Sequence, residues 1–121
     1  MKVYISSYWK YRGVRGVQIS NSKPADVNVY RGLPTLYPSW EMVKAWNDVK
    51  KLPPDNAERK RTWKKFECEY WKKLSRIGAD NILPLLSEGD VYLCWCGKRS
   101  ECHRGILAAW LEKQGVEVEE L

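Results

Sequence analysis

The stretch DVYLCWCGKRSECHRGILAAWLEKQGVEVEEL, residues 90–121, decides the fold class. Residues 90–95 are nearly all apolar, as in a strand buried on both faces. Residues 102–115 place apolar side chains on one face of a helix, and residues 116–121 alternate between apolar and acidic. The order strand, helix, strand predicts a βαβ unit with parallel pairing and a right-handed crossover.

Upstream of this unit the sequence predicts further elements of both kinds. A β-branched and aromatic pattern favours strands at 2–6 and 16–20, whereas apolar side chains at three- and four-residue steps favour helices at 38–51, 54–78 and 79–89. The prolines of residues 24–38 predict a mostly irregular segment. We therefore expect a single α/β domain over residues 1–121, with a small, mainly parallel sheet flanked by helices.

The composition is that of an ordinary soluble chain. Its 121 residues fit one hydrophobic core, and 44% of them are hydrophobic. No apolar run approaches the ~20 residues that span a bilayer. The first ten residues lack the apolar core and cleavage site of a signal peptide, so we expect a cytoplasmic protein without a membrane partner.

The charge is spread unevenly along the chain. Residues 1–80 carry 17 Lys/Arg and 8 Asp/Glu (17 − 8 = +9), whereas residues 81–121 carry 4 and 7 (4 − 7 = −3). Seven Trp and seven Tyr accompany this basic excess. Basic and aromatic side chains together favour an anionic partner that stacks, which is either a small molecule or a nucleic acid.

One hypothesis is a noncatalytic nucleic-acid-binding module. The helix at 54–78 carries a basic stripe separate from its apolar one, and the loop at 9–16 adds further positive charge. In this hypothesis phosphates contact the basic stripe while exposed aromatic rings stack on bases. The stripe consists of Arg61, Lys65, Lys72 and Arg76, and the stacking candidates are Tyr8, Trp9 and Tyr11.

A second hypothesis places a thiol-dependent site at the start of the last helix. Three of the four cysteines and the only histidine lie within residues 94–103. With Ser100 as the N-cap, the first helical turn holds Glu101, Cys102 and His103, and Arg104 adds positive charge nearby. Free backbone N–H groups and nearby cations lower the pKa of a thiol there. Cys102 is then the nucleophile or redox centre, and His103 handles the proton.

The same junction has the form of an anion-binding loop. A strand, a short loop containing a glycine and a helix N-terminus together present backbone N–H groups to an anion. Basic side chains of this loop, and of the loop at the end of the first strand, supplement them. The predicted anion-binding residues are Lys98, Arg99, Ser100, Arg12 and Arg15.

Other uses of the cysteines stay open. Cys94, Cys96, Cys102 and His103 offer three thiolates and an imidazole, which suit zinc, although their spacing differs from that of common zinc motifs. A Cys96–Cys102 disulfide is disfavoured in a reducing cytoplasm. Cys94 is also a candidate for plain core packing. We expect no cofactor, with a structural zinc domain as the alternative.

Three stretches of the chain look familiar. LCWCGKRSECHRGILAAWL at 93–111 resembles the C-terminal signature of the domain-of-unknown-function 488 family (DUF488), in which Cys-His-Arg opens a helix. RGVQISNSKP at 15–24 and LYPSWEMVKAW at 36–46 are similar to earlier parts of that family. The CWC…CH run also looks like a phage-associated family, domain of unknown function 4326. The resemblance implies an α/β fold with a site at Cys102, His103 and Arg104, and it implies no particular reaction.

Overall fold

A computed structural model describes residues 1–96 and 99–121. Its sheet has five strands in the order β3-β2-β4-β1-β5, and every pair of neighbours is parallel. β4 and β1 are therefore interior strands, and the carboxyl ends of all strands meet at one edge. The strands are β1 (Lys2–Ser7), β2 (Gly16–Gln18), β3 (Arg31–Gly32), β4 (Val91–Cys94) and β5 (Glu117–Glu120).

The α-helices begin at side-chain caps where the sequence offers them. The Ser39 side chain accepts a hydrogen bond from the Met42 backbone N–H, and the Asn56 side chain accepts one from the Arg59 N–H. No helix in the described part of the chain combines the length and apolar character needed to cross a membrane. The α-helices are α1 (Trp40–Val49), α2 (Ala57–Ile77), α3 (Ala79–Ile82) and α4 (His103–Lys113), and short 3-10 turns cover Pro34–Leu36, Leu83–Leu85 and Arg99–Glu101.

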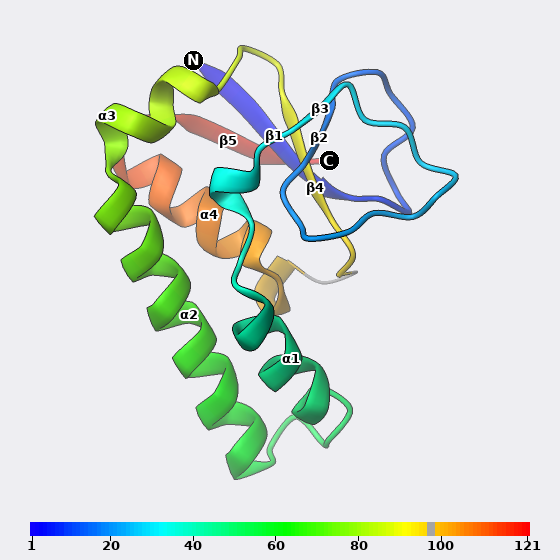
Figure 1. Ribbon diagram of the computed structural model, residues 1–121, viewed down its shortest axis with the longest axis vertical. Helices are drawn as coiled ribbons and strands as arrows, with labels where there is room; N and C mark the ends of the chain where they lie inside the picture. Colours follow the sequence, from blue (N-terminus) through cyan, green and yellow to red (C-terminus); the bar gives the residue numbers. More distant parts are fainter. Residues whose placement is uncertain (97–98) are drawn as a thin grey trace.

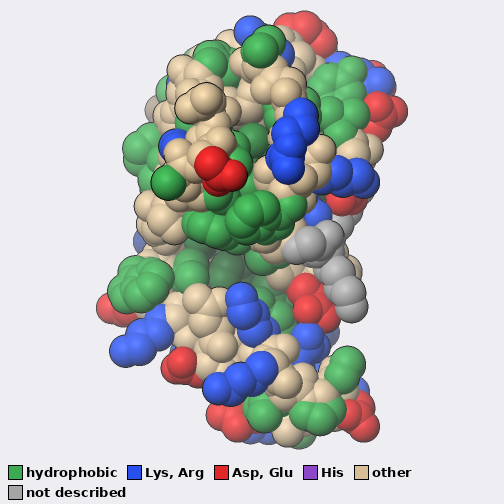
Figure 2. All heavy atoms as spheres, turned by 90° about the vertical axis from the view of Figure 1, so that its right-hand side faces the viewer, with side chains coloured by type: hydrophobic (Ala, Val, Ile, Leu, Met, Phe, Trp, Pro, Cys, Tyr) green, Lys and Arg blue, Asp and Glu red, His purple; other side chains and the backbone are tan. Residues whose placement is uncertain are grey.

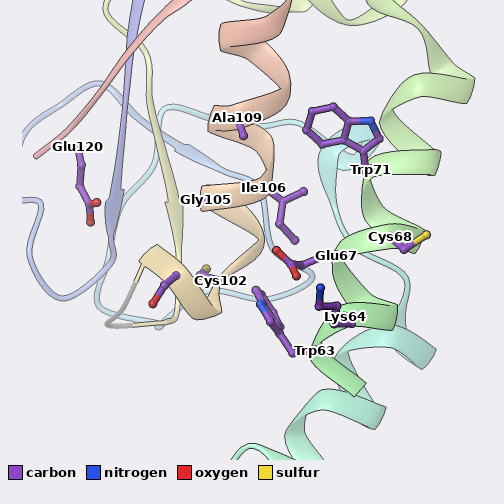
Figure 3. Close-up of a pocket in the computed structure, with 11 residues that line it drawn as sticks. Trp63, Lys64, Glu67, Cys68, Trp71, Cys102, Gly105, Ile106, Ala109 and Glu120 are labelled. Atoms are coloured by element: carbon purple, nitrogen blue, oxygen red, sulfur yellow. The ribbon is translucent and has the colours of Figure 1, made fainter. Parts of the chain in front are cut away.

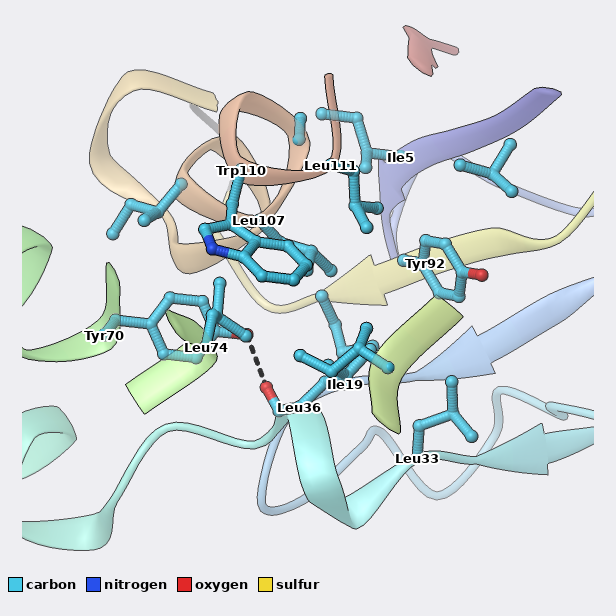
Figure 4. Packing of buried hydrophobic residues seen from close by; sticks show 14 of the residues in the cluster. Ile5, Ile19, Leu33, Leu36, Tyr70, Leu74, Tyr92, Leu107, Trp110 and Leu111 are labelled. Carbon is cyan, nitrogen blue, oxygen red and sulfur yellow. Dashed lines mark hydrogen bonds between the residues drawn. The ribbon is translucent and has the colours of Figure 1, made fainter. Parts of the chain in front are cut away.

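The two faces of the sheet are covered differently. Figure 1 shows α1, α2 and α4 together on one side of the sheet and the loops between β1 and β3 on the other. On the helical side, Ile5 and Tyr92 of the sheet pack with Leu107 and Trp110 of α4, and Tyr70 of α2 closes the core (Figure 4). On the other side a smaller cluster is built around Tyr8, Val91 and Leu93, with loop residues Tyr11, Val27 and Val29 against it.

The predicted fold class is confirmed, since the chain forms a parallel α/β sheet within one compact domain. The predicted βαβ unit at the C-terminus is present, but β5 pairs with β1 instead of β4. The strand β3 lies in the segment expected to be irregular. It is only two residues long, so it has no alternating pattern to detect.

The start of α4 also differs from the sequence prediction. Ser100 is not the N-cap, because it lies within a 3-10 turn that precedes the helix. Cys102 is the N-cap, with an extended backbone (φ −139°, ψ 145°) that separates this turn from α4. Cys102 therefore lies just before the first turn of α4, while His103 and Arg104 lie within it.

Candidate functional site

A pocket lies at the carboxyl edge of the sheet, where β2 and β4 end and α4 begins. It has a volume of about 380 Å³, and α1 and α2 form its far wall. Figure 2 shows one face of the molecule hollowed across its middle, with hydrophobic side chains along the hollow. Ligands of parallel α/β proteins bind at this edge, so the pocket is our candidate functional site. We call it the edge pocket.

Four tryptophans line the edge pocket. Trp40 of α1 and Trp95, which follows β4, expose 64% and 40% of their surface. Trp46 and Trp63 form the inner part of the wall, with ring centroids 4.9 Å apart. The Trp95 indole N–H donates to the Ser22 carbonyl at 2.9 Å, which fixes the orientation of that ring. The pocket thus offers flat apolar surfaces that favour a planar ligand.

Three cysteine sulfurs converge on the inner side of this pocket. The Sγ atoms of Cys94, Cys96 and Cys102 all lie within 4.8 Å of one another. Cys94 and Cys102 are buried, and Cys96 is partly exposed. Cys96 and Cys102 line the pocket, whereas Cys94 lies behind them. We refer to the three as the sulfur cluster.

The structure pairs Cys94 with Cys102 as a disulfide, and Cys96 is outside it. The sequence disfavours a disulfide, and the pair considered is Cys96–Cys102, so both the bond and its partners differ from the prediction. β4 ends at Cys94, and the Cys94 sulfur lies beside Arg104 of α4 and is bonded to Cys102. Cys94 is therefore part of the site and not only of the core.

Arg104 of α4 contacts the sulfur cluster through its guanidinium group. Its side chain is buried, and Nη1 donates to Cys94 Sγ at 3.3 Å and also to the Cys96 carbonyl. Nη2 pairs with Glu120 of β5 at 3.3 Å. Burial raises the pKa of the Cys96 thiol, and the positive charges of Lys50 and Arg104 partly oppose that rise. Arg104 thus orients the cysteines from behind and does not face the pocket.

His103 lies beside Cys102 and is fully buried. Its Nε2 is 2.8 Å from the Ile19 carbonyl, and because a carbonyl only accepts, Nε2 carries the proton. Nδ1 is then an acceptor, 3.9 Å from Cys102 Sγ. Burial lowers the pKa of His103 to about 4, so the ring is neutral near pH 7. The acceptor nitrogen of His103 therefore faces Cys102 Sγ.

Of the predicted anion-binding residues whose side chains the structure describes, none lines the edge pocket. Arg12 donates to the Tyr8 carbonyl at 2.9 Å. Arg15 lies at the amino end of β4, where it pairs with the buried Asp90 at 3.4 Å. Ser100 lines a different hollow, described below. Lys98 and the side chain of Arg99 lie outside the described residues.

Among the described residues that line the edge pocket, Lys50 at the end of α1 carries a positive charge. Asn21 and Asn47 add amide groups to the same wall. Sequence reasoning missed these residues and Trp40, because α1 is remote from the cysteines along the chain. No local spacing links the two segments, and only the packing of α1 beside α2 brings them together.

The three aromatic residues that we expected to be exposed, Tyr8, Trp9 and Tyr11, differ in their burial. Tyr8 is completely buried, where its hydroxyl is 2.7 Å from Ser20 Oγ, so the expectation of an exposed ring is wrong. Tyr11 is partly buried. Trp9 is 53% exposed, and its ring centroid is 5.7 Å from that of Trp95 at the rim of the edge pocket.

A second and larger hollow of about 980 Å³ lies between α2 and α4 (Figure 3). Gly105 and Ala109 leave room for it on α4, and Trp63 and Trp71 bound it on α2. Cys102 borders both hollows. Figure 3 shows the Cys68 side chain directed away from α4, and its sulfur is not one of the three that converge.

The fold and this site define a parallel α/β protein with a cysteine-bearing pocket at the carboxyl edge of its sheet. A family model described as the active DUF488-N3 subclade matches residues 7–115. The chain therefore belongs to this DUF488 family, as the three familiar stretches led us to expect. No curated protein matches the chain, and no solved structure does.

Proposed function

We propose that the protein is a thiol-dependent enzyme that binds a nucleotide-like ligand in the edge pocket and acts on it through a cysteine sulfur. One observation carries this proposal. Cys96 and Cys102 form part of the wall of a pocket that is otherwise lined by indole rings, at the edge where α/β proteins bind ligands.

The walls of the pocket favour a flat, anionic ligand. Exposed indole faces such as that of Trp40 stack on any base, because every base has a π-face. Lys50 supplies a positive charge for a phosphate, and Asn21 and Asn47 supply hydrogen bonds for the polar edge of a ring. The volume of about 380 Å³ falls at the lower end of the roughly 300–1,000 Å³ of small-molecule sites, which suits one mononucleotide.

The residues around Cys102 supply the chemistry in this proposal. In the reduced protein the Cys102 sulfur bonds to the ligand while Nδ1 of His103 accepts its proton, and the group displaced from the ligand leaves with that proton. Because the pKa of the buried ring is about 4, the proton is on His103 only during the reaction. The Ile19 carbonyl keeps the ring in the tautomer that this transfer needs. Arg104 contacts no ligand and acts as a positioning residue for Cys94 and Cys96.

Binding of nucleoside monophosphates, followed by tryptophan fluorescence, tests the proposal. Trp40→Ala removes an exposed wall of the pocket, and we expect it to weaken binding about fivefold or more, because stacking contributes about 1–3 kcal/mol per base. Trp71→Ala is the matched control, since Trp71 is a partly exposed tryptophan that lines the other hollow and not the edge pocket. Equal affinities for wild type and Trp40→Ala contradict the proposal, as does a complete lack of nucleotide binding.

A noncatalytic nucleic-acid-binding module is the second candidate. The observation that favours it is the exposed pair of Trp9 and Trp95 beside the pocket, together with the four exposed basic residues of the stripe on α2. It predicts that Trp9→Ala weakens binding of a single-stranded oligonucleotide and that salt weakens this binding steeply. Reversal of Arg61, Lys65 and Lys72 to Glu abolishes binding in this case, and unchanged binding rejects the candidate.

A further inference from the structure

We infer that the three cysteines of the sulfur cluster bind a single zinc ion in the reduced protein, with a fourth position open to the edge pocket. The inference concerns the wall that the proposed function uses, but it does not need a nucleotide to bind. With zinc bound, the Cys102 sulfur is a metal ligand, so attack by that sulfur belongs to the zinc-free, reduced protein. It rests on the convergence of Cys94, Cys96 and Cys102 and on the charges around them.

The spacing of the sulfurs suits one ion. Thiolates on a tetrahedral zinc, each about 2.3 Å from the metal, lie about 3.8 Å apart. The three Sγ atoms lie within 4.8 Å of one another, so small side-chain adjustments bring them to this distance. A [4Fe–4S] cluster binds each of its cysteines through a separate iron atom, which places the cysteine sulfurs farther apart than on one zinc ion. Soft thiolates in this geometry select zinc over magnesium or calcium.

The backbone at Cys94 and Cys102 is also spaced for two ligands of one ion. Their Cα atoms are 7.6 Å apart, beyond the roughly 4.4–6.8 Å usual for cysteines joined in a disulfide. When a metal ion lies between two thiolate sulfurs, the Cα atoms of the two cysteines can be farther apart than in a disulfide. The reduced pair is therefore well placed to share an ion with Cys96.

The surroundings balance the charge of such a site. Zinc with three thiolates carries one net negative charge, which is costly to bury alone. The buried Arg104 guanidinium lies 3.3 Å from Cys94 Sγ and provides a compensating positive charge. Charged hydrogen bonds of this kind are typical of the outer shell of metal sites.

The ligand set differs from the one that the sequence offered. His103 is not among the group of mutually close ligand atoms within the described residues. Its Nε2 is engaged with the Ile19 carbonyl, and Nδ1 lies on the Cys102 side of the ring. Three protein ligands and a free fourth position are typical of catalytic zinc, whereas four protein ligands are typical of structural zinc. The free position lies on the side of Cys96 and Cys102, where the pocket is.

Zinc content and affinity test this inference directly. Untagged protein is purified with a phosphine reductant and zinc sulfate, desalted and analysed by elemental emission, and the affinity is measured against a chromophoric chelator. We expect one zinc per chain in the wild type and in Cys68→Ser, whose exposed thiol is the matched control. Cys96→Ser should bind zinc at least about tenfold more weakly. Cys96 is partly exposed, so this variant keeps the buried core intact.

Three outcomes overturn the inference. They are a folded, reduced protein without zinc, equal zinc affinity in wild type and Cys96→Ser, and a Cys94–Cys102 disulfide that persists in the reduced protein by peptide mass spectrometry. Cobalt(II) gives an independent readout, since tetrahedral thiolate ligation produces a charge-transfer band that Cys68→Ser retains and Cys96→Ser loses or weakens. Loss of nucleotide binding in Trp40→Ala with unchanged zinc content separates the proposed function from this inference.

Discussion

Stability should fall in acid because His103 is buried as a neutral ring. Burial lowers the pKa of His103 from 6.5 to about 4, so the folded state binds this proton more weakly than the unfolded state does. The stabilising contribution is therefore complete above about pH 6.5 and is lost progressively as the pH falls toward 4. At about 1.4 kcal/mol per pH unit, this group alone contributes roughly 3 kcal/mol over that window.

The matched variant is His103→Gln, whose side-chain amide can still donate to the Ile19 carbonyl but does not titrate. Urea unfolding of the metal-free, reduced proteins, followed by tryptophan fluorescence, gives the free energy of unfolding at several pH values. Carboxylates also titrate in this range, so the difference between the two proteins isolates the histidine. We expect the wild type to lose about 3 kcal/mol more than the variant between about pH 6.5 and 4. Parallel pH profiles would refute the reasoning.

The remaining predictions concern buried polar contacts away from the pocket. Asp90→Asn should lower the free energy of unfolding by about 2 kcal/mol, because the buried Asp90 carboxylate pairs with the partly exposed Arg31 and accepts from the Tyr92 hydroxyl at 3.0 Å. A loss below about 0.5 kcal/mol in urea unfolding, the range of surface substitutions, contradicts this. Tyr70→Phe should cost about 1 kcal/mol, because it leaves the buried Leu36 carbonyl without the hydroxyl donor seen in Figure 4. An unchanged urea midpoint argues against it.

Much of the fold is readable from local patterns. The apolar run at 91–94 and the helix-period pattern at 103–113 are strong signals, and both elements form where the sequence places them. β3 could not be predicted within the proline-rich segment. A two-residue strand has no alternating pattern of its own, and its formation depends on pairing with β2. The pairing of β5 with β1 is likewise a long-range choice that spacing does not encode.

The candidate site was only partly readable, for a related reason. The cysteines and His103 are close in sequence, so their clustering could be predicted. The other wall of the pocket comes from α1, and neither Trp40 nor Lys50 carries a local mark of that role. Whether a polar side chain is buried also depends on the tertiary fold and cannot be predicted from the neighbouring sequence. The sequence places Arg104 in the candidate site beside Cys102, but only the fold shows that its guanidinium is buried and contacts Cys94 Sγ.

The most direct test of the proposed site is the protection of Cys96 by a bound nucleotide. The reduced, chelator-treated protein is alkylated with iodoacetamide, and the rate at each cysteine is resolved by mass spectrometry with and without a saturating nucleoside monophosphate. Cys96 lines the edge pocket and Cys68 does not, so Cys68 is the internal control. We predict that the nucleotide slows alkylation of Cys96 and leaves Cys68 unchanged. Equal rates at Cys96 with and without nucleotide would contradict a nucleotide site at the sulfur cluster.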